Sequence, residues 1–207
     1  MFKQTLLLAA VLAAVPAAHA ASSELVTNGS FESTALANGS WALVNGLSGW
    51  TIAGGDGLLE LRNNVAGSAQ SGVVYAELDG NHNVTISQSL ATKVGQAYTL
   101  SFWYSSRINV AIDSLGLQWT VGNVTGSVDT TGPFNGTSNN VWQNFTTTFI
   151  AQSALTNLSF AALGKDDTLG TSLDNVSVKS AIPEPATLAL LAGGLAAIGV
   201  AKRRRNI

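Results

Sequence analysis

The chain has 207 residues, with ten Lys and Arg, twelve Asp and Glu, no cysteine and a formal net charge of −2. The lack of cysteine excludes disulfides, thiolate catalysis and zinc sites built on cysteine. Half of the basic residues are Lys3 and Lys202–Arg205, so residues 21–181 are acidic, with five basic residues against eleven carboxylates. This charge balance disfavours nucleic acid as a partner.

The first twenty residues have the three parts of a secretory signal peptide. Lys3 supplies a positive start, Leu6–Val15 an apolar stretch, and Ala18–Ala20 a small-residue cleavage site. We therefore expect residues 1–20 to be removed on export. Residues 21–181 are then one domain's worth of chain, held together by its core or by a metal because disulfides are excluded.

Short runs that alternate between apolar and polar residues recur through residues 21–181, separated by Gly, Asn, Ser and Asp. A period of two predicts strands with one buried face, and the regular spacing predicts an all-β, antiparallel jelly-roll sandwich. No long stretch has helical periodicity. The predicted strands are Val73–Leu78, Val84–Leu90, Ala97–Tyr104, Leu115–Val121, Trp142–Ile150, Thr156–Leu163 and Leu173–Lys179.

The run Ala97–Tyr104 shows the alternation most clearly. Its even-numbered positions carry Tyr, Leu, Phe and Tyr, which predicts a core-facing side, whereas Trp103 lies among hydroxyl residues on the other side. By the same reasoning Trp119 and Trp142 are predicted to lie in the core, and Trp50 is predicted to pack at the start of a strand. The Gly- and Asn-rich segment Thr130–Asn140 is predicted to be a loop.

The C-terminus combines Pro183-Glu184-Pro185, an uncharged run Ala186–Ala201 and the basic Lys202–Arg205. The prolines keep the chain extended, as a protease or transpeptidase cleft requires. The apolar run would cover roughly 24–27 Å as a helix, slightly less than the ~30 Å of bilayer hydrocarbon, so it is a weak anchor. The basic end should stay in the cytoplasm.

This tripartite end, residues 182–207, resembles the PEP-CTERM sorting domain of exported bacterial proteins, with Pro183, Glu184 and Pro185 as the name-giving tripeptide. The resemblance implies processing by a membrane transpeptidase of the exosortase type. The precursor would be held in the inner membrane, and the mature protein would be at the cell surface or extracellular. A simple C-terminal membrane anchor is the alternative.

A second resemblance covers most of residues 21–181. Asn28–Glu32, Gly49-Trp50, Gly95–Phe102, Trp142–Phe149 and Leu173–Val178 look like the jelly-roll, galactose-binding-like carbohydrate-binding modules. The resemblance implies a non-catalytic role in sugar binding or adhesion. A likeness of fold alone does not prove it.

In that family a glutamate near the first strand and an aspartate opening the last strand commonly help to hold a structural calcium ion. The matching positions are Glu32 and Asp174. Asp174 also precedes Val176 by two residues and Val178 by four, so alternation predicts that it faces inward and needs a cation, hydrogen-bond donors or a proton. The alternative is that Asp174 bonds backbone amides and that Glu32 is solvated.

Two further carboxylates, Glu77 and Asp79, share one face of their predicted strand. We interpret them as an ordinary solvated edge, with a second ligand pair and a catalytic pair as the open alternatives. His82 lies in a turn-like sequence and is expected to be exposed rather than catalytic. Glycoside hydrolysis would need two positioned carboxylates, and sequence spacing does not reveal their separation.

Exposed aromatic rings are the other candidate for sugar binding, because sugars stack their apolar faces on flat rings. Trp103 is the best candidate, with Arg107 close enough in sequence to add hydrogen bonds from the same sheet. The sequence as a whole predicts an exported, non-catalytic carbohydrate-binding or surface-matrix protein. A glycoside hydrolase on the same sandwich and a purely structural surface protein are the alternatives.

Overall fold

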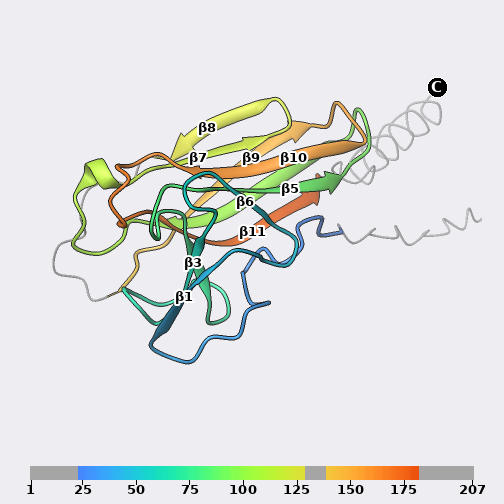
Figure 1. Ribbon diagram of the computed structural model, residues 1–207. Helices are drawn as coiled ribbons and strands as arrows, with labels where there is room; N and C mark the ends of the chain where they lie inside the picture. Colours follow the sequence, from blue (N-terminus) through green and yellow to red (C-terminus); the bar gives the residue numbers. More distant parts are fainter. Residues whose placement is uncertain (1–22, 129–138, 182–207) are drawn as a thin grey trace, which may run out of the picture. The chain divides into compact units, whose positions relative to one another are not determined.

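The structure is a computed structural model in which residues 23–128 and 139–181 are described (Figure 1). The predicted signal peptide, most of the predicted loop and the whole sorting tail with Pro183, Glu184 and Pro185 lie outside these residues. Within them, no helix is long and apolar enough to cross a membrane.

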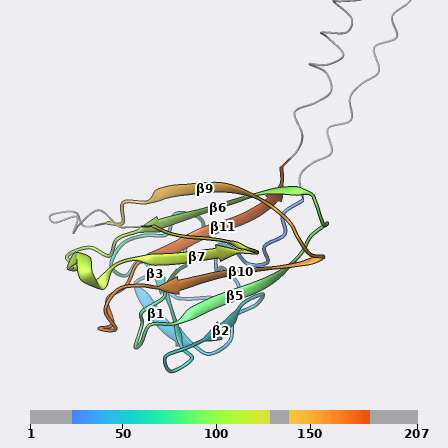
Figure 2. The ribbon, with the colours of Figure 1, turned by 90° about the horizontal axis from the view of Figure 1, so that it is seen from above.

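The described residues form two antiparallel sheets that pack face to face (Figure 2). The strands are β1 Ser40–Val44, β2 Thr51–Ala53, β3 Leu59–Asn63, β4 Tyr75–Glu77, β5 Thr85–Ala91, β6 Ala97–Ser105, β7 Leu117–Val121, β8 Val124–Val128, β9 Gln143–Ile150, β10 Leu155–Ala162 and β11 Ser172–Ser180. The first sheet has the order β1-β3-β4-β11-β6-β9 and the second the order β2-β5-β10-β7-β8. From β4 onward the chain changes sheet at each connection except the β7–β8 turn. The predicted antiparallel β-sandwich is confirmed.

Each of the seven predicted strands is present, with ends shifted by two residues at most. The alternating pattern does not predict β1, β2, β3 and β8. β2 has only three residues, and β3 is buried at every position. The sequence of β3 alternates between leucine and charged residues, but Glu60 and Arg62 are buried like the leucines, so the strand has no exposed face.

The core lies between the two sheets. Tyr98, Leu100 and Phe102 of β6 are buried there, as alternation predicts. The ring of Phe102 meets that of Phe160 from β10 edge-on, with 4.9 Å between the centroids, and so joins the two sheets. Trp119 is 5% exposed and belongs to this core, as predicted.

Trp50 also belongs to the core, as a packing residue just before β2. Its ring stacks on Phe31 at 5.9 Å, and its indole nitrogen donates to the carbonyl of Asn28 at 3.1 Å. The N-terminal segment that precedes β1 is therefore attached to the sandwich by a buried aromatic pair.

The two ends of the sandwich differ in what they carry. At one end the β5–β6, β7–β8 and β9–β10 turns lie next to the last residues of β11, where the amide of Ala181 donates to Ala97 at 2.9 Å. We call it the terminal end. The opposite end is formed by the β4–β5, β6–β7 and β10–β11 connections.

Candidate functional site

The outer face of the six-stranded sheet, which points away from the core, carries aromatic and charged side chains on neighbouring strands. In β3, Leu59 and Leu61 face the core, so Glu60 and Arg62 face outward. Trp41 of β1 and Tyr75 of β4 stand directly opposite Arg62 on its two sides, and Glu77 stands opposite Glu60. Because paired residues of antiparallel strands point to the same side, these side chains form one group.

Three of these outward side chains and one loop residue form an ion network. Arg62 donates from Nε to Glu60 Oε1 at 2.5 Å and pairs through Nη1 with Glu77. Arg107, which follows β6, places Nη1 3.0 Å from Glu77 Oε1 and 2.8 Å from the carbonyl oxygen of Thr168. Glu77 is thus held between two guanidinium groups.

The network is buried although it lies on the outer face. The side chains of Arg62 and Glu77 are 2% and 0% exposed. Burial raises the pKa of Glu77 to about 7, against the lowering effect of Arg62, Arg107 and the amide of Gly170, which donates to Glu77 at 2.8 Å.

The interpretation of Glu77 and Asp79 as a solvated edge is wrong. Both are 0% exposed, because the β10–β11 connection covers the outer face at this end of the sheet. The amides of Asp167 and Leu169 in that connection donate to Asp79 Oδ2 at 3.1 and 3.2 Å. Strand periodicity showed that the two carboxylates share a face, but the loop that covers this face comes from almost ninety residues further along the chain.

A raised pKa is what a general acid needs, but Glu77 lacks access to solvent. A catalytic carboxyl must reach its substrate within hydrogen-bond distance. The oxygens of Glu77 instead face two arginines and a backbone amide. His82, by contrast, is exposed, as expected, and its Nδ1 lies 3.1 Å from an oxygen of Asp166.

Glu32, which precedes β1, and Asp174 of β11 both bind the loop between β3 and β4. Asp174 Oδ2 accepts from the amides of Gln70 and Ser71 at 2.8 and 2.9 Å. Glu32 Oε1 accepts from the amides of Val73 and Val74 at 2.8 and 2.7 Å. The two carboxylates therefore bind the loop on either side of Gly72.

Gly72 is required by this arrangement. Its φ of +67° is in the left-handed region, and a Cβ there would lie 2.3 Å from Glu32 Oε1. Glycine thus allows the carboxylate of Glu32 to approach the loop backbone closely.

Asp174 is buried, but it does not face the core as alternation along the strand predicted. A β-bulge shifts the register between Asp174 and Ser177, with Asn175 at a φ of +48°. Leu173 and Val176 consequently both face the core, and Asp174 points to the outer face, where the loop covers it completely. Alternation predicted the wrong direction for the Asp174 side chain because the bulge adds one residue to the strand between Asp174 and Val176.

Burial raises the pKa of Asp174 to about 7. The amides of Ser71, Asn175 and Gln70 lower it, and the nearby carboxylate of Glu32 raises it. Among the described residues neither carboxylate forms an ion pair with a basic side chain. The described part of the chain also contains no group of three or more His, Cys, Asp or Glu side chains placed to hold a metal.

Three tryptophans lie on or near the outer face. Trp103 is half-buried and stands opposite Asp174 and Asn144, on the side away from the core. The placement of Trp142 in the core was wrong. It lies just before β9, half-buried, where its ring meets Tyr75 edge-on at 5.7 Å and its indole nitrogen donates to Ser68 at 3.0 Å.

The most exposed tryptophan described is Trp41, with 55% of its surface open to solvent. No role was predicted for Trp41 because β1 was not predicted. The sequence feature that indicates this strand is the short run Ser40–Val44 after Asn-Gly, in which Trp41 alternates with smaller residues. Only the pairing of β1 with β3 shows that Trp41 lies beside Arg62.

Comparison with known proteins gives two matches along the chain. Residues 24–179 match the family described as "Protein of unknown function (DUF642)", and residues 181–205 match the PEP-CTERM protein-sorting motif. The chain belongs to the DUF642 family, and its C-terminal residues are a PEP-CTERM sorting motif, as the sequence indicated. No curated protein matches the chain.

The solved structures that resemble this one include carbohydrate-binding modules. TmCBM61 in complex with beta-1,4-galactotriose has a TM-score of 0.53 and 17% identity, covering 77% of this chain and 99% of that chain. Family 16 Carbohydrate Binding Module-2 has a TM-score of 0.47 and 18% identity, covering 74% of this chain and 98% of that chain. A family 35 carbohydrate binding module from Clostridium thermocellum has a TM-score of 0.43 and 15% identity, covering 69% of this chain and 99% of that chain. At such identities the likeness to TmCBM61 establishes the fold alone.

Proposed function

We propose that this protein is an exported, non-catalytic carbohydrate-binding protein of the cell surface or extracellular matrix, and that it binds a glycan on the outer face of its six-stranded sheet. The observation that carries the proposal is Trp41. Its ring is 55% exposed and stands directly opposite Arg62, which two carboxylates hold in place. A flat ring on a rigid, charged support suits stacking against a sugar face.

Trp103 and Arg107 keep their proposed roles in binding. Trp103 lies on the same outer face, half-buried, and supplies a second ring. The guanidinium of Arg107 binds Glu77 through Nη1, and its side chain remains 22% exposed. It is therefore a fixed donor at the edge of the buried network, available to a sugar hydroxyl.

We also propose a structural calcium ion at Glu32 and Asp174, which would add stability and would not contact the glycan. Two carboxylates that bind the same loop without a basic partner favour a cation, and calcium prefers such oxygen ligands. Backbone carbonyls or water would have to complete the coordination. Five backbone amides already donate to these carboxylates, so the hydrogen bonds alone are the competing explanation.

Sorting completes the proposal. A PEP-CTERM motif implies an exported protein that is processed at the membrane. We propose an exosortase-type enzyme as the processing partner. We also propose a precursor held in the inner membrane by residues 186–201, with its C-terminus in the cytoplasm.

The test of glycan binding is a glycan array with the domain in calcium, followed by titration of the glycans that bind. Trp41→Ala should weaken affinity by about five- to a hundredfold, the loss found for other aromatic stacking platforms. The matched control is Ile112→Ala, which removes a similarly exposed side chain, 57% open to solvent, from the β6–β7 connection.

Unchanged affinity in Trp41→Ala, with the fold intact, would overturn the assignment of this face. Turnover of chromogenic glycosides would favour the hydrolase alternative. Absence of any bound glycan would favour a purely structural surface protein.

A further inference from the structure

We propose that the terminal end of the sandwich is a lipid-contacting surface that lies on the membrane before the tail is processed. The surface consists of the exposed apolar residues Val94, Ile150 and Leu155, and Ile150 and Leu155 line a hollow. The inference rests on the membrane-held precursor of the proposed function and goes beyond it, because it assigns a second binding surface to the folded domain.

The three apolar side chains are unusually exposed. Val94, Ile150 and Leu155 are 68%, 61% and 65% open to solvent. They lie on two turns that are tied side by side, since Gly95 donates to Ala151 at 2.8 Å and Thr92 to Ala154 at 2.9 Å. Large apolar side chains gathered at loop tips mark a contact with a protein or a membrane.

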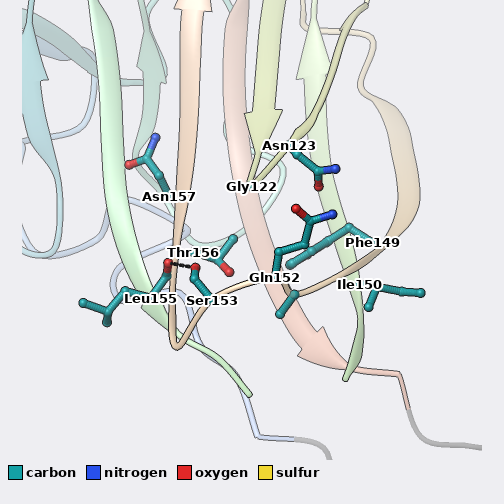
Figure 3. Close-up of a pocket in the computed structure, with 10 residues that line it drawn as sticks. Gly122, Asn123, Phe149, Ile150, Gln152, Ser153, Leu155, Thr156 and Asn157 are labelled. Carbon is teal, nitrogen blue, oxygen red and sulfur yellow. Dashed lines mark hydrogen bonds between the residues drawn. The ribbon is translucent and has the colours of Figure 1, made fainter. Parts of the chain in front are cut away.

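Ile150 and Leu155 line a hollow of about 280 Å³ (Figure 3). Its polar lining consists of neutral amides and hydroxyls, including Asn123, Gln152 and Ser153, and the buried Phe149 also lines it. Figure 3 shows Leu155 and Ile150 extending outward on opposite sides of it. Neutral donors between two apolar projections match the boundary between lipid headgroups and acyl chains.

The distribution of charge agrees with lipid as the occupant. Exposed carboxylates gather at the opposite end, on the loops that carry Asp56, Asp113, Asp166 and Asp167. The terminal end carries the exposed Lys93 on the same turn as Val94, and Glu24 lies 3.9 Å from Lys179. An anionic membrane would therefore repel the opposite end and attract Lys93.

Only a short segment separates the terminal end from the uncharged run of the sorting motif. Ala181 is bound to the terminal end through Ala97, and only residues 182–185 separate it from the uncharged run that begins at Ala186. Four residues span at most about 14 Å. When the run is in the bilayer, this end of the domain is therefore within reach of the headgroups, and lipid is its nearest partner.

The absence of cysteine allows a direct experiment. Val94→Cys and Leu155→Cys are each labelled with an environment-sensitive fluorophore in the full-length precursor. The labelled chains are reconstituted into vesicles of phosphatidylethanolamine and phosphatidylglycerol. Ile112→Cys and Leu163→Cys, 57% and 49% exposed at the opposite end, are the matched controls.

We expect blue-shifted emission and several-fold stronger quenching by lipid-attached nitroxide at Val94→Cys and Leu155→Cys than at the two controls. Equal quenching by aqueous iodide at all four positions, in chains that sediment with the vesicles, would overturn the lipid contact and leave the membrane-held precursor standing. Chains that do not sediment with the vesicles would overturn both.

Discussion

At the level of single residues, the sequence did not show the surroundings of two buried carboxylates. Glu77 is buried between Arg62 and Arg107, and Asp174 is buried against backbone amides. In each case a group that is charged in water is held in a site that is costly for an unpaired charge. Removing the group that compensates the buried charge should therefore lower the free energy of unfolding strongly.

Arg62→Met should lower the free energy of unfolding by about 3–5 kcal/mol, because Glu60 and Glu77 would remain buried without their shared counter-ion. Urea denaturation measures this loss. Lys165→Met is the control, since Lys165 forms only an exposed pair with Asp113 and its loss should leave the midpoint nearly unchanged. If the two variants have equal midpoints, the network contributes no stability.

Asp174 should make stability depend on pH. Its folded pKa of about 7 lies above the ordinary value of 3.8, so in chelator its contribution is complete at low pH and is lost as the pH rises through 7. The wild-type domain should then melt at a lower temperature at pH 8 than at pH 5.5. Asp174→Asn should reduce this difference, with Glu77 accounting for part of what remains.

Calcium should reverse this dependence, since it binds the ionised carboxylate. A calcium concentration of a hundred times Kd adds about 2.7 kcal/mol, roughly 6–10 °C in Tm for a domain of this size. Asp174→Ala should abolish the calcium-dependent part and Glu32→Ala should weaken it. An unchanged Tm of the wild type at pH 8 with and without calcium would leave the backbone amides as the whole explanation.

At the scale of elements, the strands of seven or more residues were all predicted, whereas the four strands that were not predicted, β1, β2, β3 and β8, have five residues or fewer. β6 alternates visibly, so its core side and the outward position of Trp103 followed from the sequence. β3 alternates between leucines and charged residues over only five positions, and its burial does not alternate because Glu60 and Arg62 are covered by other parts of the chain. The bulge in β11 was also hidden, since nothing around Asn175 indicates an extra residue.

The tryptophans of β6 and β7 test the assignment of Trp103 to the outer face and of Trp119 to the core. Trp103→Ala should weaken glycan affinity by about five- to a hundredfold with little loss of stability, if Trp103 binds sugar. Trp119→Ala should lower the free energy of unfolding by about 3–5 kcal/mol, because its ring is buried beside Phe145. A strong loss of stability in Trp103→Ala would place that ring among the packing residues instead.

At the scale of the whole molecule, the chain joins a sandwich to a sorting motif that begins where the sandwich ends. The DUF642 match stops at residue 179 and the PEP-CTERM match starts at residue 181. Function at this scale therefore depends on both parts. The sandwich carries the proposed binding faces, and the motif implies that they are displayed outside the cell.

Glu184→Ala should leave full-length protein in the inner membrane, because the tripeptide Pro183-Glu184-Pro185 is the element that the processing enzyme is proposed to recognise. The wild type should lose its tail. Mass spectrometry of membrane and surface fractions measures both forms. Equal processing of the two would show that Glu184 is not recognised.

The all-β class, seven strands, the core positions of β6 and the sorting motif could be predicted from local pattern, because alternation, turn residues and a short linear motif need no distant partner. The burial of particular polar residues could be seen only in the folded chain. Glu77, Asp79 and Asp174 are enclosed by loops up to a hundred residues away in the chain, and Trp41 gains its setting from pairing with β3. Burial is a property of what covers a residue, and that depends on the packing of distant segments.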